Sequence, residues 1–184
     1  MSRVLIIGGG PAGYSAALFT AKYGLKTVMY DTRETKMQKA YLYNYLGIDE
    51  IHGSEFINKA RHQVEKFGAI ILEEKVVSVE RATDDFKIKT DSGRSDHGKY
   101  LVISTGVNSD LLTQLEVALE GKDVKVDRHC QTSIENVYAP GWTSRSQIQA
   151  IISAGDGAAA AIHLIANEAG KPYRDFDVPP DQTS

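Results

Sequence analysis

The sequence predicts an α/β fold, in which strands and helices alternate along the chain. Short apolar runs that end at turn residues recur through the 184 residues, as is typical of the buried strands of a parallel sheet. Between the first two runs, small side chains indicate a helix that packs closely on the sheet. A chain of this length can form one substantial domain. We therefore expect a single domain over residues 1–184 with a parallel sheet at its centre.

The first strand, residues 4–7, is followed by a turn with the spacing G-x-G-x-x-G. The first glycine permits the tight turn, the second lets the backbone approach a pyrophosphate, and the third lets the next helix pack against the strand. Backbone N–H groups and the positive end of that helix then face the anion. The turn predicts a nucleotide-binding site rather than an ordinary glycine turn, and its residues are Gly8, Gly10, Pro11, Ala12 and Gly13.

The second strand, residues 26–30, ends at Asp31. An acidic side chain about 20 residues beyond such a turn binds a ribose 2′-hydroxyl in dinucleotide-binding folds. Asp31 is therefore the candidate for the ribose contact, and Thr32 and Glu34 are close enough in sequence to take that role instead. The complete β-α-β-acid order indicates dinucleotide binding more strongly than the glycines alone.

The alternation continues after a polar, tyrosine-rich connection. Ser54 can cap a helix that ends at Gly68, and the apolar face of that helix comprises Phe56, Ala60, Val64 and Phe67. Residues 69–72 predict a short buried strand. Residues 75–80 and 86–89 alternate apolar and polar side chains, which predicts a hairpin beside the main sheet.

The second half of the chain is expected to form a buried strand, a short helix and two short strands, over residues 100–103, 111–115, 124–126 and 137–139. The last large element is a helix over residues 147–169 that stops at Gly170. Very small side chains in the middle of this helix indicate close packing on the sheet. The tail, residues 172–184, carries three prolines and few apolar residues and is expected to be extended.

Composition excludes several function classes. The net charge of −3 provides no basic surface for nucleic acid, and no apolar stretch is expected to reach the ~20 residues that cross a membrane. The five histidines lack metal-ligand spacing, so no metal site is expected. Cys130 is the single cysteine, which excludes an internal disulfide and a C-x-x-C pair. The first strand leaves no room for a signal peptide, so the expected location is cytoplasmic.

Taken in order, these motifs resemble thioredoxin reductase, within the flavoproteins that have two dinucleotide-binding domains. Residues 8–17, GGGPAGYSAA, resemble the FAD pyrophosphate turn of that family. Residues 43–47, which include Asn44, resemble its E-N-[WY]-P-G segment. The further matches are the helix–strand passage 53–79 whose backbone holds the adenine, the A-T-G turn at 105–106, the T-S-x-x-x-[VI]-[FY]-A-x-G-D signature at 132–142, and the R-Q-A…A-G-D-G helix opening at 149–157.

This resemblance implies a three-layer ββα FAD/NAD(P)-binding domain of Rossmann-like fold, with a central parallel sheet, a flanking β-meander and helices on the other face. It implies FAD as the cofactor, and family members are commonly homodimers. Besides the glycine turn and Asp31, the implied cofactor-binding positions are Asn44, Val76, Val77, Thr105, Gly106, Gly141, Trp142, Gln149 and Ala150. No catalytic side chain is implied, because the flavin itself transfers the hydride or electrons.

The chain departs from this family after Gly106. Residues 107–112 resemble the stretch beyond the family's inserted NADPH domain, so that domain and its C-x-x-C are expected to be absent. The family's glycine-glycine-glutamine loop is also unmatched in residues 35–43. The expected function is an FAD-binding oxidoreductase that receives electrons from a redox partner protein or a diffusing donor. The alternatives are a non-catalytic FAD or adenine-dinucleotide module, and a domain that binds NAD(H) weakly while Trp142 blocks the flavin.

Three side chains alter the expected site. Trp142 stands where the family has an aspartate that holds the ribityl chain, and an indole only donates hydrogen bonds. Trp142 therefore either stacks near the cofactor or fills vacated space. Ile148 replaces an arginine, and the loss of that positive charge is expected to lower the flavin potential. Arg128 and His129 could lower the thiol pKa of Cys130, but a structural cysteine is favoured because reactivity needs exposure.

Overall fold

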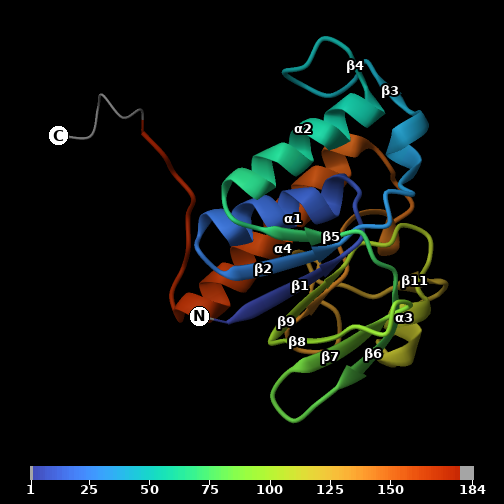
Figure 1. The fold of residues 1–184 in the computed structure, drawn as a ribbon, viewed down its shortest axis with the longest axis vertical. Coiled ribbons are helices and arrows are strands. Elements are labelled where there is room, and N and C mark those ends of the chain that lie inside the picture. The colour runs from blue at the N-terminus through green and yellow to red at the C-terminus, as the bar shows by residue number, and fades with distance from the viewer. Residues whose placement is uncertain (1, 179–184) are drawn as a thin grey trace.

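The structure is a computed structural model and describes residues 2–178. At its centre lies a five-stranded parallel sheet with strand order β12-β9-β1-β2-β5 (Figure 1). The strands are β1 (Arg3–Ile7), β2 (Lys26–Tyr30), β5 (Ile70–Leu72), β9 (Tyr100–Ile103) and β12 (Val137–Tyr138). The predicted α/β fold with a central parallel sheet is confirmed.

The sheet is covered on both faces, so one strand contributes to two cores. Successive side chains of a strand point to opposite faces. In β1, Val4 and Ile6 pack in the core beneath the helices, whereas Leu5 and Ile7 pack in the core on the other face. All four are buried, which explains why this strand is an uninterrupted apolar run.

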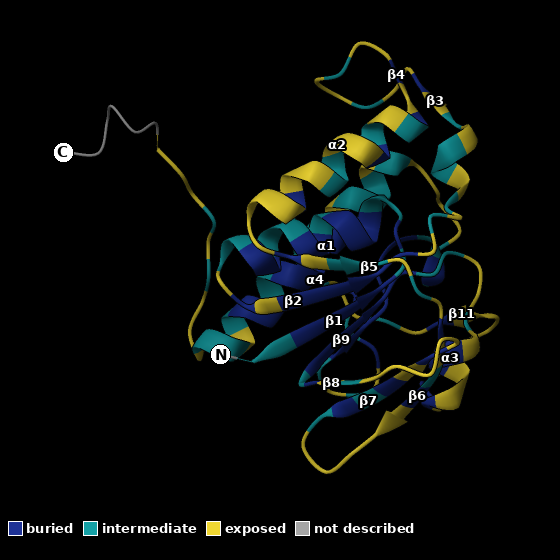
Figure 2. Cartoon of the chain, in the orientation of Figure 1, coloured by how far each residue is buried: buried dark blue, intermediate teal, exposed yellow. Residues whose placement is uncertain are grey.

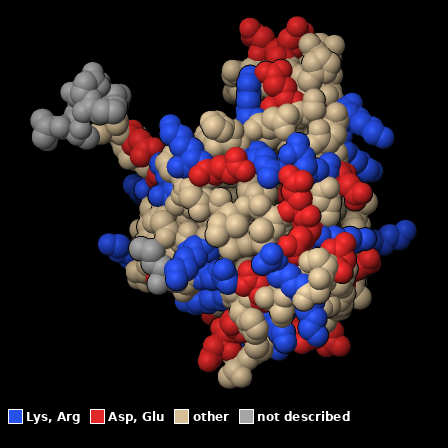
Figure 3. Space-filling model, in the orientation of Figure 1, with Lys and Arg blue, Asp and Glu red and all other residues tan. Residues whose placement is uncertain are grey.

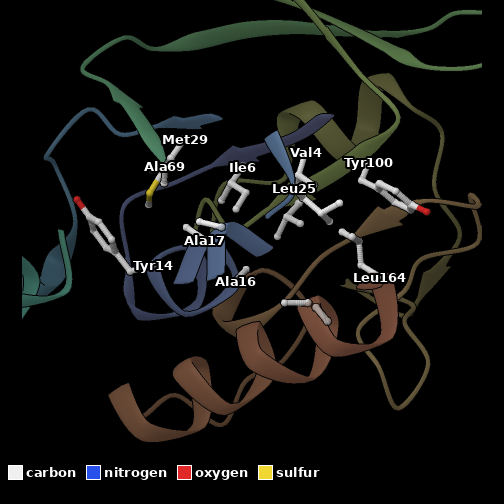
Figure 4. Packing of buried hydrophobic residues seen from close by; sticks show 14 of the residues in the cluster. Val4, Ile6, Tyr14, Ala16, Ala17, Leu25, Met29, Ala69, Tyr100 and Leu164 are labelled. Carbon is white, nitrogen blue, oxygen red and sulfur yellow. The ribbon is translucent and has the colours of Figure 1, made fainter. Parts of the chain in front are cut away.

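Three long helices cover one face of the sheet, α1 (Pro11–Lys22), α2 (Gly53–Lys66) and α4 (Ala150–Ala169) (Figure 1). Small side chains allow α1 and α4 to approach each other. A Cβ added to Gly157 of α4 would lie 2.1 Å from the carbonyl oxygen of Ala12 in α1. Figure 4 shows Ala16 and Ala17 of α1 beside Ile6 of the sheet. The close packing expected from the sequence is therefore present.

A three-stranded antiparallel meander covers the other face. It consists of β6 (Val76–Arg81), β7 (Phe86–Thr90) and β8 (Ser95–Gly98). Val79, Phe86 and Ile88 are buried against Leu5 and Leu101 of the sheet. In Figure 2 the buried residues concentrate in the sheet and on the sides of the helices and the meander that face it. The three-layer ββα arrangement is confirmed.

Several element boundaries differ from the predictions. The strand β8 was not predicted from its own residues, because its sequence is polar and its position depends on pairing with β7. Ser54 does not cap α2, which begins at Gly53 with His52 at the N-cap and no side-chain cap hydrogen bond. Phe67, which was predicted on the apolar face of this helix, is 40% exposed, whereas Ile57 of α2 is buried.

Shorter elements also differ from the expected pattern. In place of a strand over 124–126, β10 (Leu119–Glu120) and β11 (Asp123–Val124) form a small antiparallel pair. The short helix α3 spans Asp110–Gln114. The rim of the molecule near the glycine turn carries the 3₁₀ helices η1 (Lys36–Lys39) and η2 (Gly141–Thr143), and the strand pair β3 (Tyr41–Leu42) and β4 (Ile51–His52).

The last helix corrects the expectation that no apolar stretch reaches the length of a membrane span. Among the described residues, α4 is long and apolar enough to cross a membrane by length and composition, with a mean hydropathy of 1.3. It begins at Ala150 rather than near residue 147. It carries Asp156 and Glu168, which pair with Arg145 and Lys99, and it packs on α1. These contacts account for α4 as a core helix of this domain.

The tail and the surface complete the description. Residues 172–178 form no helix or strand, as expected, and the remaining tail positions 179–184 lie outside the described residues. Tyr173 packs edge-on against Tyr23, with ring centroids 4.9 Å apart. On the face drawn in Figure 3, acidic and basic side chains are interspersed rather than gathered into a basic patch.

Candidate nucleotide-binding site

A cavity of about 860 Å³ lies at the carboxyl ends of β1, β2 and β9. In open α/β sheets this edge is where ligands bind. All predicted cofactor-binding residues except Gly13 and Gly141 line the cavity, namely Gly8, Gly10, Pro11, Ala12, Asp31, Asn44, Val76, Val77, Thr105, Gly106, Trp142, Gln149 and Ala150. The structure thus brings together residues from the beginning, the middle and the end of the chain.

The glycine turn joins β1 to α1, and its glycines have different roles. Gly8 has a φ of 115°, and a Cβ there would lie 2.3 Å from the carbonyl oxygen of Ser104. A Cβ on Gly13 would lie 2.0 Å from the carbonyl oxygen of Gly8, so Gly13 serves packing and not the cavity surface. At Gly10 the nearest atom is Thr35 Oγ1, at 3.7 Å, which leaves the backbone accessible. Pro11 begins α1, where its missing N–H is not needed.

Asp31 lies directly beneath this turn and is only 2% exposed. Its Oδ2 accepts a hydrogen bond of 2.7 Å from the Tyr14 hydroxyl, and its Oδ1 accepts one of 2.7 Å from the backbone N–H of Arg33. A Cβ on Gly9 would lie 1.9 Å from Oδ1, a constraint that the sequence motif did not reveal. Each carboxylate oxygen has a further lone pair that can accept a hydrogen bond from a ribose hydroxyl. The ribose contact by Asp31 itself stays a prediction.

The N-terminus of α4 forms the far wall. Gln149 is its N-cap residue, and the side-chain oxygen of Gln149 accepts a hydrogen bond of 2.9 Å from Asn44 Nδ2. Gly141 has a φ of 77° and donates its N–H to Asp156 Oδ2 over 3.3 Å. Burial raises the pKa of Asp156, an effect that Arg145, with Nε 2.9 Å from Oδ2, opposes. The segment before α4 is therefore bound to the second helical turn of α4 through Gly141 and Asp156.

Trp142 lines the cavity from the short helix η2. The ammonium group of Lys36, from η1 on the opposite rim, lies 4.4 Å from the centroid of the Trp142 ring. Sequence reasoning did not single out Lys36, because no local pattern signals a contact between segments so far apart in the chain. The same holds for Thr35, Met37, Ser104 and Ser153, which also line the cavity.

Cys130 is 2% exposed, and burial raises the pKa of its thiol to about 12. It also lies near the carboxylate of Asp156, whose charge acts in the same direction. A buried, protonated thiol agrees with the structural role favoured from the sequence. Among residues 2–178, no group of three or more His, Cys, Asp or Glu side chains is arranged to hold a metal ion.

Comparisons with known proteins agree with this geometry. The family described as "Pyridine nucleotide-disulphide oxidoreductase" matches residues 2–107 and 48–158. The thioredoxin reductase of Streptomyces clavuligerus is 33% identical over 163 residues, which cover 85% of this chain and 48% of that protein. That of Aquifex aeolicus is 35% identical over 109 residues, covering 56% of this chain and 33% of the relative. The chain thus spans about half the length, or less, of these relatives.

Solved structures show the same fold at lower sequence identity. An atypical thioredoxin reductase from Desulfovibrio vulgaris Hildenborough superposes with a TM-score of 0.86 at 18% identity, covering 92% of this chain and 99% of that chain. A thioredoxin reductase from Gloeobacter violaceus gives a TM-score of 0.85 at 19% identity, covering 97% of this chain and 99% of that chain. The glycine turn, the three layers and these matches show that the chain belongs to the pyridine nucleotide-disulphide oxidoreductase family.

Proposed function

We propose that this protein is an FAD-binding oxidoreductase of thioredoxin reductase type that lacks an NADPH domain and a redox disulfide of its own. The observation that carries the proposal is the cavity of about 860 Å³ that extends from the glycine turn to the N-cap of α4. Its volume is within the usual range for small-molecule and cofactor sites. The backbone of the glycine turn, Asp31 and the N-terminus of α4 line it. A dinucleotide-binding site requires groups of these kinds for the pyrophosphate, the ribose and the far end of the ligand.

The residues present fit the cofactor over most of its length. In this proposal Gly8 and Gly10 hold the pyrophosphate, Asp31 binds the ribose, and the backbone of Val76 and Val77 receives the adenine. Thr105, Gly106, Gln149 and Ala150 lie where the flavin end is expected. When bound, FAD supplies the hydride or electron transfer, and the protein side chains position it and tune its potential. Trp142 departs from this fit, because it offers no acceptor for the ribityl hydroxyls.

The electron source in this proposal is external. The sequence has no second G-x-G-x-x-G, and its one cysteine is buried. The chain is therefore not expected to reduce thioredoxin unaided, and a redox partner protein or a diffusing donor must reduce the cofactor. We expect this activity in the cytoplasm, and we expect homodimers, as is common in the family that the chain resembles.

The single tryptophan makes the proposal directly testable. Because Trp142 lines the cavity, titration with FAD should quench its fluorescence to saturation at one FAD per chain. The complex should then show flavin absorbance that bleaches anaerobically with NADPH or with a reduced electron-carrier protein. Absence of FAD binding to the folded protein would refute the proposal.

A second function, a non-catalytic module that binds FAD or another adenine dinucleotide, is favoured by the absence of a redox pair of cysteines. It predicts the same FAD quenching of Trp142 but no reduction of the bound flavin by any donor tested. Reduction by either class of donor would exclude it.

A further inference from the structure

Lys36 lies beside the glycine turn, at the edge of the cavity. It is the first residue of η1 and lines the cavity. The preceding residue, Thr35, has its Oγ1 3.7 Å from the point where a Cβ on Gly10 would be. The backbone at Lys36 is therefore next to the part of the turn that leaves room for a phosphate.

Trp142 provides a platform for the ammonium group of Lys36, whose Nζ is 4.4 Å from the ring centroid. The residue before Trp142, Gly141, lies close to the first turn of α1, because a Cβ on Gly141 would lie 3.1 Å from the Cβ of Ala12. The neighbours of both partners, Thr35 and Gly141, thus lie beside the glycine turn and the first turn of α1. Lys36 and Trp142 both line the cavity, and the indole face holds the ammonium group there.

Within residues 2–178, Lys36 forms no ion pair, whereas nearby Arg33 has Nη1 3.7 Å from Glu73 Oε1. A cation–π contact at an exposed site is weak, and hydrogen bonds between an ammonium and a phosphate are considerably stronger. A diphosphate bound at the turn would therefore attract the ammonium group from the indole face.

We propose that Lys36 is the side chain that recognises the diphosphate of the bound dinucleotide, and that Trp142 holds its ammonium group at the turn before the ligand binds. This inference rests on the proposed function, since it takes a dinucleotide as the ligand of the cavity. The role is one of positioning and specificity, because it favours phosphorylated ligands over the corresponding nucleoside. In this proposal the ring of Trp142 stacks against the ammonium group of Lys36.

The test is calorimetric titration of the full chain with FAD, ADP and adenosine at low salt. Lys36→Met removes the charge while keeping a long apolar stem, and we expect it to weaken ADP and FAD binding by about tenfold or more. Adenosine binding should not change, because adenosine has no phosphate. Lys36→Arg should bind ADP within about threefold of the original protein, since it retains the charge.

Lys39→Met is the matched control, because Lys39 belongs to the same 3₁₀ helix but does not line the cavity. It should leave ADP affinity unchanged. The inference is overturned if Lys36→Met binds ADP as tightly as the original protein, or if it weakens adenosine equally. If the original protein binds neither FAD nor ADP, the proposed function fails, and this inference fails with it.

Discussion

The hydroxyl of Tyr14 donates a hydrogen bond of 2.7 Å to Oδ2 of Asp31, and this contact links α1 to the end of β2 beneath the glycine turn. Burial raises the pKa of Tyr14, and the hydrogen bond to Asp31 raises it further, so the phenol remains a neutral donor. The carboxylate is thereby held in one orientation under Gly9. Tyr14 is thus a positioning residue for the side chain that we propose for the ribose contact.

Tyr14→Phe should therefore destabilise the fold. The substitution leaves a buried carboxylate oxygen without its protein donor, and a hydrogen bond to a charged group contributes about 2 kcal/mol. Urea unfolding monitored by circular dichroism would measure the loss. Tyr23→Phe is the matched control. Tyr23 is the C-cap residue of α1, the helix that contains Tyr14, and its hydroxyl makes no hydrogen bond to a described residue. Equal stability of the two variants would contradict the prediction.

Trp142→Asp should tighten FAD binding, by about tenfold, because a carboxylate at this place can accept hydrogen bonds from the ribityl hydroxyls. The affinity for ADP, which has no ribityl chain, should fall, because the variant lacks the indole that holds the Lys36 ammonium group. Both affinities can be measured by calorimetry, since the variant has lost the only tryptophan. Unchanged or weaker FAD binding would show that residue 142 does not occupy the place inferred from the resemblance.

Ile148→Arg should raise the midpoint potential of bound FAD. Ile148 lines the cavity and is 38% exposed, so an arginine there would add a positive charge near negative charge on the reduced cofactor. We expect the two-electron midpoint potential to rise by about 30 mV, which corresponds to a modest electrostatic stabilisation of the reduced cofactor. A spectroscopic redox titration would report it. Ile151→Arg adds the same charge at a side chain that is 37% exposed but does not line the cavity, and its potential should move less.

The parts of the fold that the sequence could predict are those with a local signal. The alternating burial of β1 follows from an uninterrupted apolar run, and Gly13 is required by its contact with the Gly8 carbonyl within the first β-α unit. Gly8 is required by its positive φ and by Ser104, at the end of β9. The turn that the motif predicted lines the cavity, and its pyrophosphate-binding role stays a prediction. The third layer followed from the alternation of β6 and β7, but the polar strand β8 carries no such signal and depends on its partner.

The rim of the site could not be predicted, because its contacts join segments that no local pattern relates. Residues 35–52 are polar and rich in tyrosine and lack strand or helix periodicity. Their arrangement depends on contacts such as the one between Met37 and Gly53, where a Cβ would lie 1.9 Å from the Met37 carbonyl oxygen. The contacts of Lys36 with Trp142 and of Asn44 with Gln149 likewise become visible only in the folded chain.

The stability of the fold in acid should depend on Glu168, near the end of α4. Burial alone would raise its pKa, but hydrogen bonds from Lys99 Nζ, the Ser2 N–H and the Tyr100 hydroxyl prevail and lower it to about 2. The carboxylate is therefore a stronger acid in the folded than in the unfolded chain, where its ordinary value is 4.5. Its stabilising contribution is complete above about pH 4.5 and is lost as the pH falls toward 2.

Glu168→Gln should accordingly lower the free energy of unfolding by about 2 kcal/mol at neutral pH. The difference from the original protein should stay constant from pH 7 to about 4.5 and shrink progressively below it, because the original protein then loses the same charge. Denaturant unfolding at a series of pH values would measure both curves. Glu120→Gln, at an exposed position outside the ion pairs of the described residues, should follow the original protein throughout. A Glu168→Gln difference that does not shrink below pH 4.5 would mean that the charge of Glu168 does not stabilise the folded chain.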